Sequence, residues 1–113
     1  MGRNRQRKKR EPVSVRAALL QSLIEGPGYG LELIKRVKDQ TEGRMVIGQG
    51  ALYPTLWDLQ EEGLVTCYET DPMPERGGRP RKYYELTADG LRSAREEQIL
   101  GRLLFGVRRE APT

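Results

Sequence analysis

Leucines recur at helical spacing in the middle of the chain and predict a helix over about residues 50–62. Leu56 and Leu59 lie within about 40° of Leu52 on a wheel of about 100° per residue. Gly63 stands where a left-handed residue ends a helix, and a β-type run begins directly after it. The pattern therefore predicts a helix that passes without a linker into a strand.

Two amphipathic helices are predicted before it. The first follows a capping residue, Ser14, and ends near Gly26, and the second covers residues 29–40. The Gly-Pro-Gly sequence at 26–28 is typical of a turn. The predicted buried faces are made of Val15, Ala18, Leu19, Leu23 and Ile24 in the first helix and of Leu33, Ile34 and Val37 in the second.

A hairpin and a long final helix are predicted in the second half. Residues 64–70 and 81–87 have the composition of strands, and the Pro- and Gly-rich segment 71–80 between them is too long for a tight turn and predicts a wing. Thr87 is a good N-cap for the final helix, with Asp89 in its first turn. Helix, helix, turn, helix and hairpin follow one another in the order of a winged helix-turn-helix.

We therefore predict a mainly α fold with a two-stranded β wing. Residues 12–87 would form the winged helix-turn-helix and residues 88–108 a C-terminal dimerisation helix. A disordered basic arm is expected at 1–11 and a tail at 109–113. A length of 113 residues suits one domain with such an appendage.

The final helix begins polar and becomes apolar, and so small a domain has little left to cover its apolar half. We expect this half to contact a second copy of the chain, and packing back on the first helix is the alternative. Gly101 indicates a bend or a close approach. The candidate dimer residues are Leu91, Ile99, Leu100, Leu103, Leu104 and Val107.

Charge is distributed unevenly along the chain. The formal net charge is +4, but the first ten residues contain six basic side chains and no acidic one. The rest of the chain has 14 basic and 16 acidic residues, so nucleic-acid binding must be argued from the position of charges and not from their total.

Several functional classes are excluded or disfavoured by composition. With one cysteine and no histidine, a structural zinc site and a His-dependent nucleophile are excluded. No paired acid-base or metal constellation stands out, so we expect neither an enzyme nor a cofactor. Cys67 is interpreted as a small packed residue rather than a redox switch. No apolar run approaches the roughly 18 residues of a membrane span, so we expect a cytoplasmic protein without a membrane partner.

The outward surface of the predicted 50–62 helix changes character along its length. Its first turn is small and nearly uncharged, whereas three acidic residues later in the helix, Asp58, Glu61 and Glu62, would repel phosphates. If the helix reads DNA, it therefore does so with its N-terminal end. Pro54 fits only near a helix start, so we expect the helix to begin near Gly50. The candidate contacts are Gln49, expected just before the helix, and Ala51, Tyr53, Pro54 and Thr55.

Further DNA contacts are predicted in three other segments, each with a plain structural alternative. The wing would reach a phosphate or a minor groove, or be only an exposed loop. The second helix would lie across the DNA backbone, or keep a solvated basic face, and its Tyr29 could equally pack at the core edge. The arm would bind DNA, or be a flexible tail. The residues concerned are Arg76, Gly77, Gly78, Arg79, Arg81 and Lys82 in the wing, Tyr29, Lys35, Arg36 and Lys38 in the second helix, and Arg3, Arg5 and Arg7 in the arm.

Three separated motifs carry a resemblance to a known family. They are Tyr29-Gly30-x-Glu32-Leu33, then Gly50-x-Leu52-Tyr53-Pro54-x-Leu56-x-x-Leu59-x-x-x-Gly63-Leu64, then Gly78-Arg79-Pro80-Arg81-Lys82-Tyr83-Tyr84-x-Leu86-Thr87-x-x-Gly90. With these motifs in this order over residues 15–90, the chain resembles the PadR family of winged helix-turn-helix transcriptional regulators, in the small form with a single C-terminal helix. The resemblance implies a dimeric, repressor-type DNA-binding protein with a helical C-terminal dimerisation element.

Residues and resemblance together predict a sequence-specific transcriptional regulator, a repressor that binds a palindromic double-stranded DNA operator as a homodimer. The alternative is a nonspecific nucleic-acid or ribosome-associated binding module with a basic N-terminal arm, which would show no preference for a palindrome at physiological salt. The resemblance also suggests a small-molecule effector of unknown identity at or near the dimer interface. Drug-binding relatives use an aromatic residue in the terminal helix, where this chain has Phe105 alone, and the sole tryptophan, Trp57, lies on the flank of the 50–62 helix.

Overall fold

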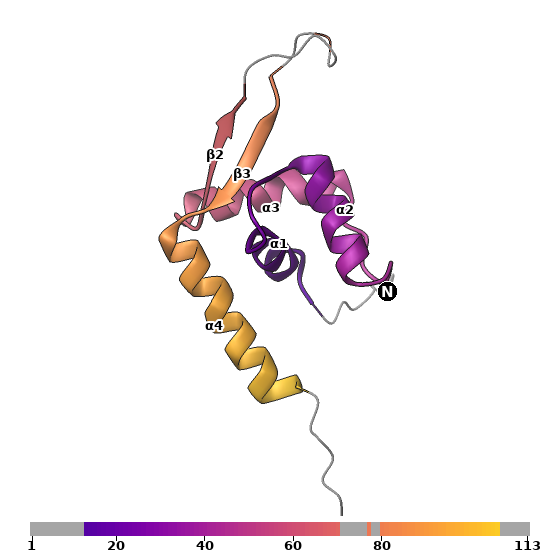
Figure 1. The fold of residues 1–113 in the computed structure, drawn as a ribbon, viewed down its shortest axis with the longest axis vertical. Helices are drawn as coiled ribbons and strands as arrows, with labels where there is room; N and C mark the ends of the chain where they lie inside the picture. The colour runs from indigo at the N-terminus through magenta and orange to yellow at the C-terminus, as the bar shows by residue number, and fades with distance from the viewer. Residues whose placement is uncertain (1–12, 71–76, 78–79, 107–113) are drawn as a thin grey trace, which may run out of the picture.

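Four helices and three short strands make up the part of the chain that the computed structural model describes, residues 13–70, 77 and 80–106. In chain order they are α1 (Val15–Leu23), β1 (Gly28–Tyr29), α2 (Gly30–Gln40), α3 (Gln49–Glu61), β2 (Val65–Glu69), β3 (Lys82–Leu86) and α4 (Ala88–Phe105). α1 packs against the other three helices, while β2 and β3 project to one end of the molecule and α4 extends toward the other (Figure 1). The predicted arm, the tail and nearly all of the wing at 71–80 lie outside the described residues.

The apolar faces predicted for the helices meet in one core. The α3 leucines at 52, 56 and 59 are fully buried, as are Leu33 and Leu19 of the two preceding helices. Val65, Tyr84 and Ala94 add one buried side chain each from β2, β3 and α4. Most of the core predicted from helical spacing is thus confirmed. Val15, Ile24 and Ile34, also predicted as buried, are only partly buried and pack against its edge.

The sheet has a third strand that the sequence did not predict. β1 pairs antiparallel with β3, so that Gly28 lies opposite Tyr84 and Tyr29 opposite Tyr83. β2 pairs on the other edge of β3, which gives the order β1-β3-β2. The helix predicted over 29–40 therefore begins one residue later, and Tyr29 is an extended residue before it. Two residues are too few to show strand alternation, so only pairing with a distant partner reveals β1.

A glycine lies just before the third helix, and another lies just after it. Gly48 precedes it, so Gln49 is the first helical residue and not, as predicted, a residue before the helix. Pro54 is therefore the sixth helical residue, and it leaves the Gly50 carbonyl without its usual donor. Gly50 is exposed, so water can replace that bond. At the other end Gly63 takes a left-handed φ of 78°, which confirms the predicted helix stop.

The start of the fourth helix lies close in space to the end of α3. Thr87 caps it by accepting a hydrogen bond from the Gly90 amide over 3.0 Å, as predicted. A Cβ at Gly90 would collide with the carbonyl oxygen of Leu64, so the start of α4 lies against the turn that follows α3. Ala94 is buried, and its carbonyl accepts from Gln21 Nε2 of α1 over 2.8 Å. The first half of α4 therefore belongs to the domain core.

Candidate nucleic-acid interface

The N-terminal turn of α3 presents an exposed surface without charge. Gln49, Gly50, Ala51 and Pro54 are exposed, and the first turn holds no acidic residue. The acidic residues Asp58, Glu61 and Glu62 are also exposed, but they lie in the C-terminal half of the helix or at its C-cap. A polyanion can therefore approach the beginning of α3 and is repelled from its end.

The side chain of Tyr53 is partly exposed to solvent and partly packed against the domain. Its side chain is 43% exposed, yet a Cβ at Gly30 would lie 2.8 Å from Tyr53 Cζ and closer still to the hydroxyl. The ring therefore packs against the start of α2, and a Cβ at position 30 would require the Tyr53 ring to move. Burial raises the pKa of Tyr84 behind it, and the neighbouring Cys67 and Tyr53 act in the same direction. Thr55, the other residue predicted to flank the outward face, is half-buried.

The basic residues of α2 have different roles. Lys35 is exposed and pairs with Asp39 over 2.8 Å, a contact that raises the pKa of Lys35. Such an exposed pair contributes little to stability, so Lys35 can exchange Asp39 for a phosphate. Lys38 is also exposed.

Arg36 does not lie on the solvated basic face that was predicted for it. Its side chain is 15% exposed, and its guanidinium donates to the carbonyls of Ser22, Gly26 and Pro27 over 2.9, 2.8 and 3.1 Å. Glu32 lies 3.5 Å from it. Helical periodicity places Arg36 at the edge of the apolar face, but the carbonyls that accept its hydrogen bonds come from the end of α1 and the turn after it.

Tyrosines line the outer face of the sheet at the base of the wing. Tyr29 and Tyr83 meet edge to face with ring centroids 5.6 Å apart, and Tyr83 stacks on Tyr68 at 5.8 Å. The guanidinium carbon of Arg81 lies over the Tyr29 ring, 4.0 Å from its centroid. Lys82 is exposed and faces the other side of β3, opposite Glu69. Tyr68 and Tyr83 were not predicted as site residues, because only strand register brings them beside Tyr29.

Other predicted contacts are described only in part. Gly77 is exposed and takes a left-handed φ of 70°, which favours glycine at this position of the wing. The remaining candidates lie outside the described residues and stay predictions: Arg3, Arg5, Arg7, Arg76, Gly78, Arg79 and, for the dimer, Val107.

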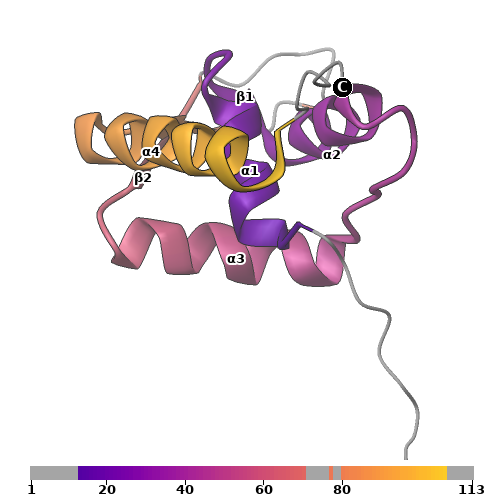
Figure 2. The same ribbon diagram turned by 90° about the horizontal axis from the view of Figure 1, so that it is seen from below.

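The second half of α4 is apolar and exposed. Ile99 and Leu100 are nearly half exposed, Leu103 is 76% exposed, and Leu104 and Phe105 are similarly open. In the single chain this half of α4 does not pack back on α1, which was the alternative. Figure 2 shows α4 crossing over α1, with α3 below it in that view. The apolar half is thus available to a second copy while α3 remains free.

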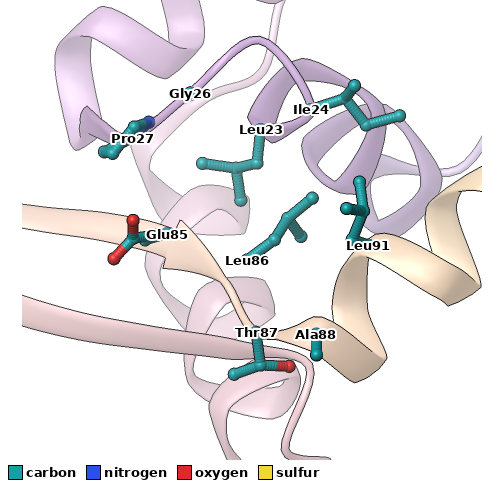
Figure 3. Close-up of a pocket in the computed structure, with 9 residues that line it drawn as sticks. All are labelled: Leu23, Ile24, Gly26, Pro27, Glu85, Leu86, Thr87, Ala88 and Leu91. Carbon is teal, nitrogen blue, oxygen red and sulfur yellow. The ribbon is translucent and has the colours of Figure 1, made fainter.

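Leu91 differs from the other candidate dimer residues because it lines a cavity of about 250 Å³. The cavity lies between the end of α1, the end of β3 and the start of α4, and Figure 3 shows Leu23 and Leu86 pointing toward one another inside it. Pockets that enclose drug-sized ligands measure about 300–1,000 Å³. This cavity can therefore accept only a smaller molecule or a single side chain.

The described residues show no grouping of three or more His, Cys, Asp or Glu side chains that could hold a metal ion. Cys67 is half-buried, and its thiol donates to Gln60 Oε1 over 3.3 Å, in keeping with a packed residue. None of the described helices has the length and apolar character needed to cross a membrane.

Three helices around a core, followed by a hairpin, define a winged helix-turn-helix protein, and the long α4 is appended to it. Residues 19–96 match the model of the transcriptional regulator PadR-like family, and the chain belongs to this family. Its members are transcriptional regulators and not enzymes, as the sequence predicted.

Individual relatives agree with this membership. The chain is 34% identical over 84 residues to the transcriptional regulator YqjI of Escherichia coli (strain K12), covering 74% of this chain but only 37% of that protein. A transcriptional regulator from Clostridium thermocellum is 27% identical, with a TM-score of 0.67 over 79% of this chain and 81% of the other. Bacillus subtilis PadR in complex with operator DNA has the same fold, with a TM-score of 0.65 and 21% identity over 88% of this chain and 51% of that one.

Proposed function

We propose that this PadR-like protein is a cytoplasmic, homodimeric repressor that binds a palindromic DNA operator. The observation that carries the proposal is the first turn of α3, which is exposed, uncharged and free of bulky residues at Gly50 and Ala51. A helix with such a start can enter a major groove closely enough for Gln49 and Tyr53 to reach base edges.

The other contacts would position the protein without reading sequence. Lys35, Arg81 and the wing at 71–80 would meet phosphates or the minor groove. The six basic residues of the N-terminal arm would add attraction that depends on salt and little on sequence. Bacillus subtilis PadR has the same fold in a complex with operator DNA, which supports this use of the fold.

Dimerisation would use the second half of α4. Two copies related by a two-fold axis place two α3 helices in symmetric positions, and a palindromic operator has the same symmetry. Covering Leu103, Leu104 and Phe105, which are at least 70% exposed, gives the association its driving force. Control by a small molecule of unknown identity stays a prediction, because the family resemblance places it at or near the dimer interface, which a single chain does not form.

Selection of duplexes from a random pool at physiological salt tests the proposal. We expect the full-length protein to enrich a palindrome whose half-sites lie about 10 base pairs apart or a multiple of this. The enriched site, placed in a promoter, should lower reporter expression when the protein is present. Enrichment of no sequence would favour the alternative of a nonspecific nucleic-acid module, and raised expression would make the protein an activator.

A further inference from the structure

A row of three tyrosines crosses the outer face of the sheet. The β1-β3 pairing sets Tyr29 opposite Tyr83, and the β3-β2 pairing sets Tyr83 opposite Tyr68. Side chains alternate along a strand, and the next residue of β3, Tyr84, is buried in the core. The three rings therefore lie on the face away from the core, in contact with one another.

Arg81 joins this row from the wing side. It precedes Tyr83 by two residues and so shares its face of the sheet. Its carbonyl accepts a hydrogen bond from the Thr70 amide over 2.9 Å, which anchors its backbone beyond the end of the hairpin ladder. Its guanidinium lies over the Tyr29 ring, 4.0 Å from the centroid. A guanidinium over an aromatic face keeps its N–H groups at the rim, where they can still donate.

The charge of Arg81 has no carboxylate partner among the residues that the structure describes. Glu32 follows Tyr29 by three residues, but its two oxygens are engaged by Arg36 over 3.5 Å and by the Tyr29 amide over 3.3 Å. Aromatic packing thus restricts Arg81, and no carboxylate of the described residues forms an ion pair with it. The guanidinium of Arg81 can therefore bind an anion from outside the domain.

We propose that Arg81, held by the ring of Tyr29, forms a binding site for one phosphate of the DNA backbone. The inference rests on the proposed function and assigns separate roles to two residues of the site. Arg81 binds the phosphate, and Tyr29 is a positioning residue that acts through its ring and not through its hydroxyl. The ring limits the conformations of a long side chain, so less freedom is lost when the phosphate binds.

The test uses the full-length protein and two labelled duplexes, one selected from the random pool and one of scrambled sequence. Binding is measured by fluorescence anisotropy over a series of salt concentrations. The variants are Tyr29→Phe, Tyr29→Leu, Arg81→Ala and the double variant Tyr29→Leu with Arg81→Ala. Tyr68→Leu is the matched control, because it removes a tyrosine from the same row without touching Arg81.

We expect Tyr29→Phe to bind as the wild type does, because the ring remains. Tyr29→Leu should weaken binding to both duplexes by about two- to fivefold, the range of an exposed cation-π contact. Arg81→Ala should weaken both and lower the salt slope by about 0.9 for each phosphate that the protein no longer neutralises. In the Arg81→Ala background, Tyr29→Leu should have no further effect, and Tyr68→Leu alone should change neither affinity nor slope.

Three outcomes would overturn the inference. If Tyr29→Phe loses as much affinity as Tyr29→Leu, the hydroxyl makes the contact. If Arg81→Ala keeps the wild-type affinity and salt slope, Arg81 faces solvent in the complex, and this result holds even if Tyr29→Leu fails to fold. If the two single effects add fully in the double variant, Tyr29 does not act through Arg81. Each of these results leaves operator selection by the wild type intact, whereas failure of the wild type to select any sequence contradicts the proposed function itself.

Discussion

The hydroxyl of Thr87 donates a hydrogen bond to the carbonyl oxygen of Gly63 over 2.7 Å and also accepts one from the Gly90 amide. One side chain thus joins the glycine that ends α3 to the first turn of α4. The orientation of the helix proposed to read DNA is thereby coupled to the start of the helix proposed to dimerise.

Replacing Thr87 tests how much these two hydrogen bonds stabilise the fold. Thr87→Val keeps the shape and removes both hydrogen bonds, and loss of an N-cap alone costs about 0.5–2 kcal/mol. We expect the free energy of unfolding to fall by at least this range in urea titrations at fixed protein concentration. Thr87→Ser keeps the hydroxyl and serves as the control. If Thr87→Val is no less stable than Thr87→Ser, the two hydrogen bonds do not contribute the expected stability.

A side chain at position 30 should displace the ring of Tyr53. A Cβ there would collide with the Tyr53 hydroxyl and lie 2.8 Å from Cζ, so Gly30→Ala should destabilise by about 1–3 kcal/mol, as overpacking does. Gly50→Ala is the matched control, because nothing lies within 4 Å of a Cβ at that position. Alanine in this helix should be neutral or stabilising by up to about 1 kcal/mol. Thermal unfolding monitored by circular dichroism compares the two, and equal stabilities would contradict the Gly30 contact.

Arg36 should matter more for stability than its neighbours on α2. Arg36→Ala removes the donor to three carbonyls, one in the last turn of α1 and two in the turn after it, and hydrogen bonds to charged groups contribute about 1.5–3 kcal/mol. We expect a loss within this range in urea unfolding. Lys38→Ala changes an exposed cation of the same helix and should stay within about 0.5 kcal/mol of the wild type. A similar small effect for both would return Arg36 to the solvated face that the sequence predicted.

Leu103 should be central to the dimer. Leu103→Glu would bury a charge against an apolar partner, so the variant should sediment as a monomer where the wild type sediments as a dimer. Arg102→Glu, an exposed charge change one residue away, is the control and should leave the dimer in place. If the Leu103 variant remains dimeric, the interface lies elsewhere.

Residues near the start of α3 should determine which bases the protein prefers. Gln49→Ala, Tyr53→Ala and Thr55→Ala should each change which bases are enriched from a random pool, because a good contact carries about 1–3 kcal/mol of discrimination. Glu61→Ala lies at the other end of the helix. It should strengthen binding to all duplexes by removing a repulsive charge, without changing base preference. Unchanged preferences in the first three variants would remove α3 from base reading.

The sequence by itself determined the elements whose signals are local. Leucine spacing, the caps at Ser14 and Thr87 and the stop at Gly63 located the helix starts and the end of α3 to within a residue or two. The first and last helices end three residues before their predicted ends. The hydrogen bonds and side-chain contacts involved span four or five residues, so periodicity and capping chemistry record them. The order of these elements was then enough to predict the winged helix-turn-helix, and the three motifs were enough to indicate the family.

Only the tertiary structure decided which distant groups meet. β1 exists because Gly28 and Tyr29 pair with β3, which lies more than fifty residues further along the chain. The same pairing also places Tyr29 beside Tyr83 and Arg81. Arg36 turns inward because carbonyls at the end of α1 and in the turn after it accept hydrogen bonds from its guanidinium, although its position in the helix permits a solvated side chain. Strand register and turn geometry are set by the packing of the whole domain, and a single chain's local pattern does not contain them.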